Sequence, residues 1–253
     1  MRQRFIQSFS TSGTEQTAID ENMLGKPYVA YIEDGRYIDW NTKGIDYANT
    51  PLTFEIISGG TIVFNGYASW LENRVISASR DNGETWETLT PTAAGTSINV
   101  SPGEKLIFKG YNANYGLSNA FCKFANSTAH FNIYGNIMSL VDYDNFPTLK
   151  TFSAEYVFPA MFRDCNAHNV DIYLPASVLT DGCYYNLFAE YGTHTIEKIK
   201  ITCLATDITA EDCTDRWLEN ISPTGTFVKH PNATWPSGAS GVPAGWTVID
   251  ADI

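Results

Sequence analysis

The stretch LPASVLTDGCYYNLF, residues 174–188, returns later in the chain as LATDITAEDCTDRWL, residues 204–218. A unit of this length cannot cover its own apolar face, so neighbouring units stack and equivalent positions carry similar residues. The two stretches therefore predict a stack of repeated units. The positions that correspond at one constant spacing are Leu174 and Leu204, Ala176 and Thr206, Val178 and Ile208, Cys183 and Cys213, Leu187 and Trp217, and Phe188 and Leu218.

Each unit is expected to hold one strand and one short apolar helix. DIYL, residues 171–174, and IKITCL, residues 199–204, predict the strands because β-branched and aromatic residues dominate there. The helical segments are expected to end at Phe188 and at Leu218. A weaker, earlier copy ends at Phe162, at a slightly shorter spacing from Phe188.

The end of the chain completes this predicted array. TFVKHP, residues 226–231, predicts a last strand, and the Pro-, Gly- and Trp-rich tail over residues 232–250 is expected to cover the end of the stack. Together these segments predict a short leucine-rich-repeat-like α/β solenoid over residues 141–253. The β domain that precedes it is expected to cap its other end.

Residues 50–140 predict an all-β domain, either a sandwich or a small barrel. Short runs rich in β-branched and aromatic residues alternate there with turns that contain Gly, Pro, Asn or Asp, which is typical of such folds. The predicted strands are LTFEI (52–56), TIVFNGY (61–67), NRVISASR (73–80), TWETLT (85–90), SINVS (97–101), KLIFKGY (105–111) and HFNIYGNIM (130–138).

One predicted hairpin, over residues 74–90, carries a recognisable turn motif. SRDNGETW, residues 79–86, fits the pattern S-x-D-x-G-x-T-W of the Asp box, which occurs in sialidases and other β proteins. We expect Asp81 and Gly83 to shape the turn and Trp86 to pack beneath it, because Asp and Gly favour turn conformations. The motif predicts a structural role and not a catalytic one.

Residues 1–49 predict an N-terminal arm followed by a hairpin. KPYVAYI, residues 26–32, and RYIDW, residues 36–40, are β-rich, and Gly35 lies in the turn between them. A segment this short buries too little surface to fold alone, so we expect it to pack on the body or on a partner. Basic and apolar residues here predict a docking peptide, and an untethered tail is the alternative. The docking residues are Arg2, Arg4, Phe5, Ile6, Phe9 and Lys26.

The charge of the chain argues against nucleic acid as a partner. The net charge is −12, with 28 acidic against 16 basic side chains, whereas binding to DNA or RNA needs Lys and Arg to neutralise phosphates. Anionic membranes are disfavoured for the same reason, and no apolar run approaches the roughly 20 residues that span a bilayer. The opening MRQRFIQSFSTSGTEQ lacks an apolar stretch, so we expect no secretory signal.

The sequence predicts no metal and no cofactor. Its five cysteines include no CxxC pair, and Cys183 and Cys213 share one repeat position, which favours small buried apolar side chains over ligands. The four histidines are widely separated. The loop DYDN, residues 142–145, begins like a calcium loop but lacks the required Gly and Glu.

Neighbouring carboxylates leave glycan cleavage open as an alternative. Glu211, Asp212 and Asp215 lie near Trp217, and pairs of carboxylates hydrolyse glycosidic bonds. The same residues open a predicted helix, where negative side chains suit the helix dipole. We therefore favour a structural role for them and predict no catalytic residue.

Aromatic side chains are the better candidates for ligand contacts. Tyr184 and Tyr185 are consecutive in a repeat, so both cannot face the core, and one is expected at the surface. Exposed aromatic rings stack on sugars or anchor protein interfaces. The candidate ligand contacts are Tyr184, Tyr185, Trp235, Trp246 and Trp70.

Four segments of the last region carry a family resemblance: YLPASVLTDGCYYNLF (173–188), IKITCLATDITAEDCTDRWL (199–218), GTFVKHPNATW (225–235) and GVPAGWTVID (241–250). Through them, residues 155–253 resemble the treponemal or BspA-like branch of leucine-rich repeats found in Bacteroidetes proteins. Members of that branch are interaction modules of cell surfaces or virions. The resemblance implies a non-enzymatic role in interactions.

A second resemblance concerns the whole chain. Its β domain and its opening NMLGKPYVAYIEDGRYIDWN, residues 22–41, resemble structural proteins of phages of Bacteroidetes, crAss-like phages included. This implies a homo-oligomeric virion protein, made in the host cytoplasm, that binds other virion proteins through its N-terminal region. A head fibre, a capsid decoration or an appendage that adheres to the bacterial surface would fit. The alternatives are a Bacteroidetes cell-surface adhesin or glycan binder, and a glycan-cleaving appendage.

Overall fold

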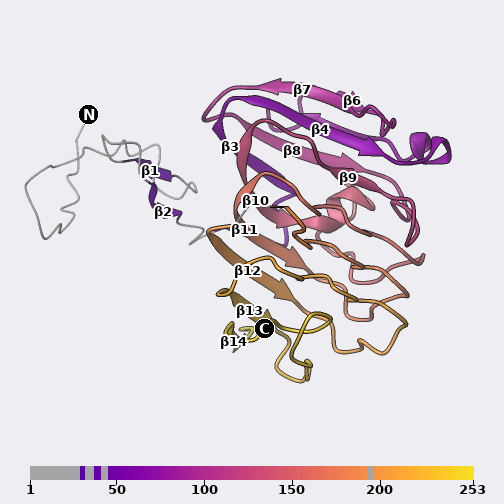
Figure 1. The fold of residues 1–253 in the computed structure, drawn as a ribbon, viewed down its shortest axis with the longest axis vertical. Coiled ribbons are helices and arrows are strands. Elements are labelled where there is room, and N and C mark those ends of the chain that lie inside the picture. Colours follow the sequence, from indigo (N-terminus) through magenta and orange to yellow (C-terminus); the bar gives the residue numbers. More distant parts are fainter. Residues whose placement is uncertain (1–28, 32–36, 41–44, 193–195) are drawn as a thin grey trace, which may run out of the picture. The chain divides into compact units, whose positions relative to one another are not determined.

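The computed structural model describes residues 29–31, 37–40, 45–192 and 196–253 (Figure 1). The chain divides into two compact units, residues 1–46 and residues 47–253. In the first unit β1 (Val29–Tyr31) pairs antiparallel with β2 (Tyr37–Trp40), which confirms the two predicted strands. The predicted turn at Gly35 lies outside the described residues.

The second unit, which we call the body, is mainly β. Its described residues form a mixed sheet of nine strands and a smaller sheet of three. The large sheet has the order β14-β13-β12-β11-β10-β3-β8-β5-β6. Its strands are β3 (Thr53–Ser58), β5 (Ile76–Ser79), β6 (Glu87–Leu89), β8 (Lys105–Gly110), β10 (His130–Asn136), β11 (Ala167–Leu174), β12 (Lys198–Cys203), β13 (Thr226–Lys229) and β14 (Thr247–Asp250).

The small sheet and two short helices complete the secondary structure of the described residues. The sheet has the order β7-β4-β9, with β7 (Thr96–Val100), β4 (Gly60–Gly66) and β9 (Cys122–Phe124). The helices are 3-10 helices, η2 (Ser69–Asn73) and η3 (Ile137–Leu140). None of the helices in the described part of the chain has the length and apolar character that crossing a bilayer requires.

The two sheets pack face to face through phenylalanines. The ring of Phe54 on β3 lies 4.6 Å from that of Phe108, 4.4 Å from that of Phe131 and 4.8 Å from that of Phe124 on the small sheet. All seven strands predicted over residues 50–140 are present. The sequence did not predict β9, because its three residues are too few to show an alternating pattern.

From β10 to β14 the sheet is parallel, and each repeated unit of the chain adds one strand to it. Val170 of β11 pairs with Ile199 of β12, and Ile201 pairs in turn with Phe227 of β13. On its other side β10 pairs antiparallel with β3. Both predicted segments, residues 50–140 and 141–253, thus contribute strands to one sheet (Figure 1). Their buried side chains form one hydrophobic core.

The segments expected to be helical are not helices. In the middle copy the N–H groups of Tyr185 and Leu187 bond within the segment, to the carbonyls of Gly182 and Tyr184. The N–H groups of Tyr184 and Phe188 instead bond to the next copy. We call these three copies, residues 154–165, 180–190 and 210–220, the turn segments.

Positive φ angles at regular intervals explain why no helix forms. A right-handed helix requires negative φ, yet Gly182 and Asn186 have φ of 58° and 52°. The same conformation occurs at every fourth residue of the other turn segments: Tyr156, Ala160, Asp164, Asp212, Arg216 and Asn220. The apolar spacing of the repeat therefore reflects a series of tight turns and not a helical face.

Apolar side chains of the turn segments stack inside the body at the predicted spacing. The rings of Phe162 and Phe188 stack with centroids 4.8 Å apart, which confirms that these positions correspond. Cys183 and Cys213 are both buried and unbonded, as expected of small apolar side chains. Burial raises the pKa of the Cys183 thiol.

The C-terminal tail packs on the last turn segment. Trp217 donates its indole N–H to the carbonyl of Gly241 at 2.7 Å, and its ring stacks on Trp235 at 5.4 Å. The chain then adds β14 to the sheet, a strand that the sequence did not predict. Its residues are all exposed, so no buried face marks them in the sequence.

The Asp box forms the predicted hairpin between β5 and β6. Asp81 accepts hydrogen bonds from the hydroxyl of Ser79 and from the N–H and hydroxyl of Thr85. These bonds lower the pKa of Asp81 to about 2. Trp86 lies under the turn and donates its indole N–H to the carbonyl of Gly83 at 3.0 Å.

Replacing Phe188 by Ala tests whether the body is one cooperative unit. The ring is buried and stacks on Phe162, so we expect a loss of about 3–5 kcal/mol in the free energy of unfolding. Urea unfolding followed by tryptophan fluorescence and by far-UV circular dichroism should give one coincident transition. Tyr111→Ala, at an exposed site, should change stability by about 0.5 kcal/mol or less. Separate transitions for the two probes would contradict a shared core.

Candidate functional site

The candidate residues from the sequence fall in three different environments. All six docking residues, Arg2 to Lys26, lie outside the described residues. Tyr184 and Trp246 are buried and offer no surface to a ligand. Trp235 is partly buried against Trp217 and belongs to the packed tail.

Tyr184 is a core residue because its side chain points into the stack. Its ring lies between those of Phe158 and Trp217, with centroid distances of 6.4 Å and 6.0 Å. Burial raises the pKa of its hydroxyl well above the ordinary value. Trp246 is held in a similar way, since its indole N–H donates to the carbonyl of Ser222 at 3.0 Å.

Tyr185 points the other way, as expected for one of two consecutive tyrosines. Arg216, from the next turn segment, donates a hydrogen bond of 2.8 Å to its hydroxyl. The guanidinium carbon of Arg216 also lies 5.5 Å from the centre of the ring. Trp70 is exposed on η2, and among the described residues no ring contact joins it to Tyr185.

Tyr185 and Arg216 belong to a larger surface that the sequence did not reveal. Arg163, from the first turn segment, lies over the rings of Phe121 at 4.8 Å and Tyr191 at 5.9 Å. Tyr67 contacts the edge of Phe121 at 5.7 Å. The aromatic–arginine surface consists of Tyr67, Arg163, Tyr185, Tyr191 and Arg216, and the buried ring of Phe121 supports Tyr67 and Arg163.

Tyr191 is held firmly although half of it is exposed. Its N–H donates to a carboxylate oxygen of Asp164 at 2.7 Å. Its hydroxyl lies 2.8 Å from the side-chain oxygen of Asn186 and 2.7 Å from a carboxylate oxygen of Glu219. Partial burial and the Glu219 carboxylate raise the pKa of Tyr191 to about 12, so the ring stays neutral. A ring fixed in this way loses little entropy when a ligand stacks on it.

A buried carboxyl group lies beside this surface. Glu190 is 3% exposed, and neither of its carboxyl oxygens has a hydrogen-bond partner. Removal from water, followed by the nearby charge of Asp164, raises its pKa to about 8, while Lys123 acts in the opposite direction. Glu190 is therefore largely protonated at neutral pH.

A repeat signal could have directed attention to Glu190 and its neighbours. Glu190 follows Asp164 at the spacing of the first two apolar copies, and Asn220 follows Glu190 at the spacing of the last two. Each of these polar residues lies at the end of a turn segment. The contacts with Tyr67 and Phe121 had no such signal, because those residues come from the sandwich part of the body.

Of the acidic residues considered for catalysis, Asp215 has structural partners. Asp215 pairs with the Nε of Arg216 at 3.0 Å and accepts a hydrogen bond from the hydroxyl of Ser240. Asp212 occupies one of the positions with positive φ. Within the described residues no group of three or more His, Cys, Asp and Glu side chains is placed to hold a metal ion.

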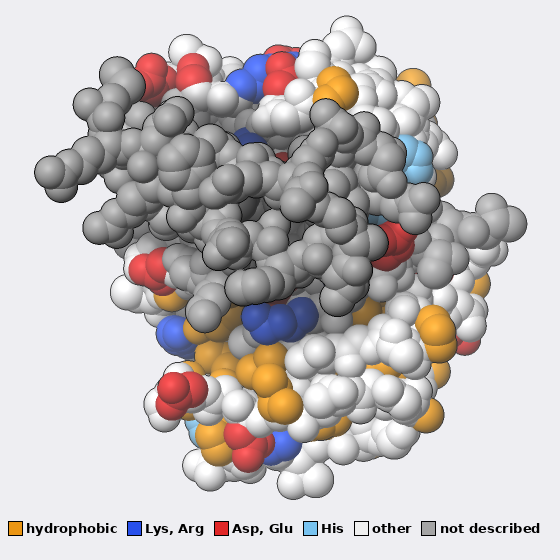
Figure 2. All heavy atoms as spheres, turned by 90° about the vertical axis from the view of Figure 1, so that its left-hand side faces the viewer, with side chains coloured by type: hydrophobic (Ala, Val, Ile, Leu, Met, Phe, Trp, Pro, Cys, Tyr) orange, Lys and Arg blue, Asp and Glu red, His pale blue; other side chains and the backbone are white. Residues whose placement is uncertain are grey.

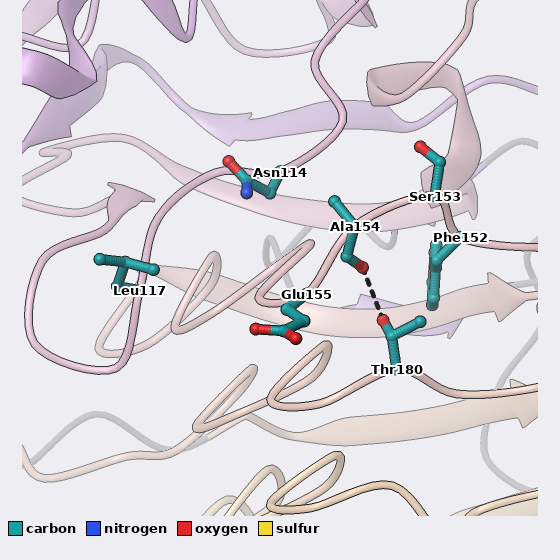
Figure 3. Close-up of a pocket in the computed structure, with 7 residues that line it drawn as sticks. All are labelled: Asn114, Leu117, Phe152, Ser153, Ala154, Glu155 and Thr180. Atoms are coloured by element: carbon teal, nitrogen blue, oxygen red, sulfur yellow. Dashed lines mark hydrogen bonds between the residues drawn. The ribbon is translucent and has the colours of Figure 1, made fainter.

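A separate shallow pocket lies between the loop after β8 and the first turn segment (Figure 3). Asn114 and Leu117 line one side, and the lining continues through Phe152 and Glu155. Thr180 closes it by donating its hydroxyl to the carbonyl of Ala154 at 2.8 Å. Apolar and polar groups meet here, but the pocket shares no residue with the aromatic–arginine surface.

Comparison with known proteins does not assign the chain to a family. No family model, no curated protein and no solved structure matches it.

Replacing Glu190 by Gln should change how stability depends on pH. The pKa of Glu190 is higher in the folded chain than its ordinary value of 4.5. The contribution of the protonated side chain to the free energy of unfolding is therefore complete below pH 4.5 and is lost as the pH rises through about 8. The Glu190→Gln variant does not titrate there. As the pH rises from 5 to 8, its free energy of unfolding in urea should increase by about 1–3 kcal/mol relative to that of the unmodified chain.

The control for this experiment is Glu84→Gln, which removes one exposed carboxylate in the Asp-box turn. It alters the net charge by the same amount and should leave the pH dependence of unfolding unchanged. An identical pH dependence for Glu190→Gln and the unmodified chain would contradict a buried, protonated Glu190.

Proposed function

We propose that this chain is a non-enzymatic structural protein of a phage virion, a head fibre, capsid decoration or other appendage that displays its body outward. Residues 1–46 dock on another virion protein, and the body carries the surface that meets the host. The observation that best supports this division is that residues 1–46 form one compact unit and residues 47–253 another, the body, which contains a continuous nine-stranded sheet. A body with a single core resists partial opening, which suits a protein exposed on a particle.

In this proposal, the parallel part of the body is a short leucine-rich-repeat array of the BspA-like kind. One strand per unit and the nearly constant spacing of the copies support this relationship. Turn segments take the place of the expected helices. Such an array repeats its surface positions along the stack and so builds a ligand surface from several units.

The aromatic–arginine surface is the proposed site of adhesion, with a bacterial surface glycan as its ligand. Tyr67 and Tyr191 are 52% and 51% exposed, and their rings can stack on sugar rings. Arg163 and Arg216 each lie beside a carboxylate, of Asp164 and Asp215, so the local charge is close to balanced. A balanced surface rich in donors and acceptors suits a hydroxyl-rich neutral ligand better than a polyanion.

The same surface would also serve a cell-surface adhesin or glycan binder of Bacteroidetes, which is the second candidate function. This alternative shares the ligand and differs in location. The two are separated by finding where the chain accumulates, and not by a binding assay.

Mass spectrometry of purified phage particles and of host outer membranes tests the location. We expect the chain in particles at a fixed ratio to the major capsid protein, as for a symmetric component. The value of that ratio separates a capsid decoration from an appendage present in a few copies. Absence from particles together with recovery in outer membranes would reject the virion proposal and favour the adhesin.

Tyr191→Ala and Tyr67→Ala test the surface itself. Each removes an exposed ring, and stacking on a ring contributes roughly 1–3 kcal/mol, so binding should weaken about 5- to 160-fold. The probe is surface polysaccharide extracted from the host, and its binding to the 253-residue chain is measured by isothermal titration. Tyr111→Ala, which removes an exposed tyrosine outside this surface, should bind normally. Equal binding by all variants would place adhesion elsewhere.

A further inference from the structure

The two edge strands of the nine-stranded sheet, β14 and β6, differ in how well they are protected against pairing with a further strand. At one end β14 pairs with β13 alone, and all four of its residues are exposed. Val248 and Ile249 are 47% and 46% exposed, and Ile253 beyond the strand is 73% exposed. Figure 2 shows hydrophobic side chains gathered on the lower part of one face, at the height where Figure 1 places β12 to β14.

The opposite end has the features that prevent pairing with another strand. There β6 has three residues, Glu87 carries a charge beside Arg80, and Pro91 follows shortly after. Short length, charge and proline are the usual means by which edge strands avoid association. In contrast, β14 contains no proline and no basic residue, and its register with β13 shows no bulge.

The hydrogen bonds of β14 show which backbone groups face the open edge. Thr247 donates its N–H to the carbonyl of Gly225, and Ala251 donates to that of Lys229, so these residues face β13. Alternate residues of a strand direct their N–H and C=O groups to opposite sides. Val248 and Asp250 therefore direct theirs to the open edge.

We propose that the open edge of β14 binds β14 of a second copy of this chain, antiparallel, with a two-fold axis at Val248. This arrangement lets the N–H and C=O of Val248 exchange two hydrogen bonds with the partner's Val248. It extends the large sheet across both copies. The proposal concerns self-association and does not depend on the proposed function.

The side chains of β14 suit this pairing. Val248 pairs with the core residue Phe227 of β13, so its side chain points to the same, inner face of the sheet. In the proposed dimer the two Val248 side chains meet on this face. Ile249, on the outer face, lies opposite the partner's Thr247. Neither contact brings like charges together, and cross-strand pairs of β-branched side chains are favourable.

Charge and symmetry favour a second copy over a foreign strand. Asp250 is the only charged residue of β14, and the ammonium of Lys229 neutralises it at 2.6 Å. Within β14 the open edge is thus nearly uncharged, although the chain has a net charge of −12. Because β6 is protected, each copy offers one open edge of the large sheet, and a two-fold contact between two such edges closes as a dimer instead of growing into a fibre.

Sedimentation of the 253-residue chain over a range of micromolar concentrations tests the proposal. The unmodified chain should sediment as a dimer. Val248→Pro removes an N–H that bonds only across the open edge, so it should yield a monomer with the far-UV circular dichroism of the unmodified chain. The control is Leu117→Lys, which replaces an exposed apolar side chain outside β14 and should remain a dimer.

A cross-linking variant makes the test independent of any loss of stability. In the proposed pairing the two residues at position 248 have Cα atoms about 5.5 Å apart, within the range that a disulfide spans. Val248→Cys should therefore form a covalent dimer under mild oxidation. The five native cysteines are buried and should not react. Leu117→Cys should give far less covalent dimer.

Two results would overturn the proposal. One is an unmodified chain that stays monomeric throughout the concentration range, with no cross-linking of Val248→Cys above that of Leu117→Cys. The other is a dimer that persists in Val248→Pro and is not captured by Val248→Cys, which would place the contact on another surface.

Discussion

The hydrogen-bond ladder between neighbouring turn segments is the interaction on which the rest of the body depends. Gly182, Tyr184, Asn186 and Phe188 donate their N–H groups to carbonyls of the next segment, while the residues between them bond within their own segment. Buried backbone groups must all find partners, and this alternation satisfies them without a helix. It holds successive units at a fixed separation, as the parallel sheet does on the other side.

This ladder also determines which side chains face the core and which face outward. Tyr184 turns inward, where its ring stacks between aromatic neighbours, and Tyr185 turns outward beside Arg216. The same separation brings Arg163 and Arg216, from the first and last segments, onto one surface with Tyr191, which directly follows the middle segment. The core and the candidate site therefore both depend on the stacking of the turn segments, and a change in the spacing of the segments would disturb both.

Sequence patterns predicted the strands well because short β runs separated by turn residues have few other structures open to them. They also predicted the corresponding positions of the repeat, as the stacking of Phe162 on Phe188 shows. The prediction of helices was wrong because an apolar residue at every third or fourth position fits a series of tight turns equally well. The positive φ at Arg216 and Ala160 has no signature in residue type, since neither residue favours it.

The candidate site was predicted only in part, and for a physical reason. Tyr185 could be found because two consecutive tyrosines cannot both be buried, but nothing local decided which one faces outward. Tyr67 and Phe121 join the site through pairing between β4 and β9, which is a contact between distant parts of the chain. Glu190 stands out only once its burial is known.

Native-state hydrogen exchange tests whether the sandwich and the turn segments form one body held by the ladder. We predict that the amides of Tyr184 and Phe188 exchange through the same global opening as those of Phe131 and Ile133 in β10. Their opening free energies should agree and should fall together as denaturant is added. Exchange of the turn-segment amides through a smaller, local opening, while β10 stays protected, would contradict it.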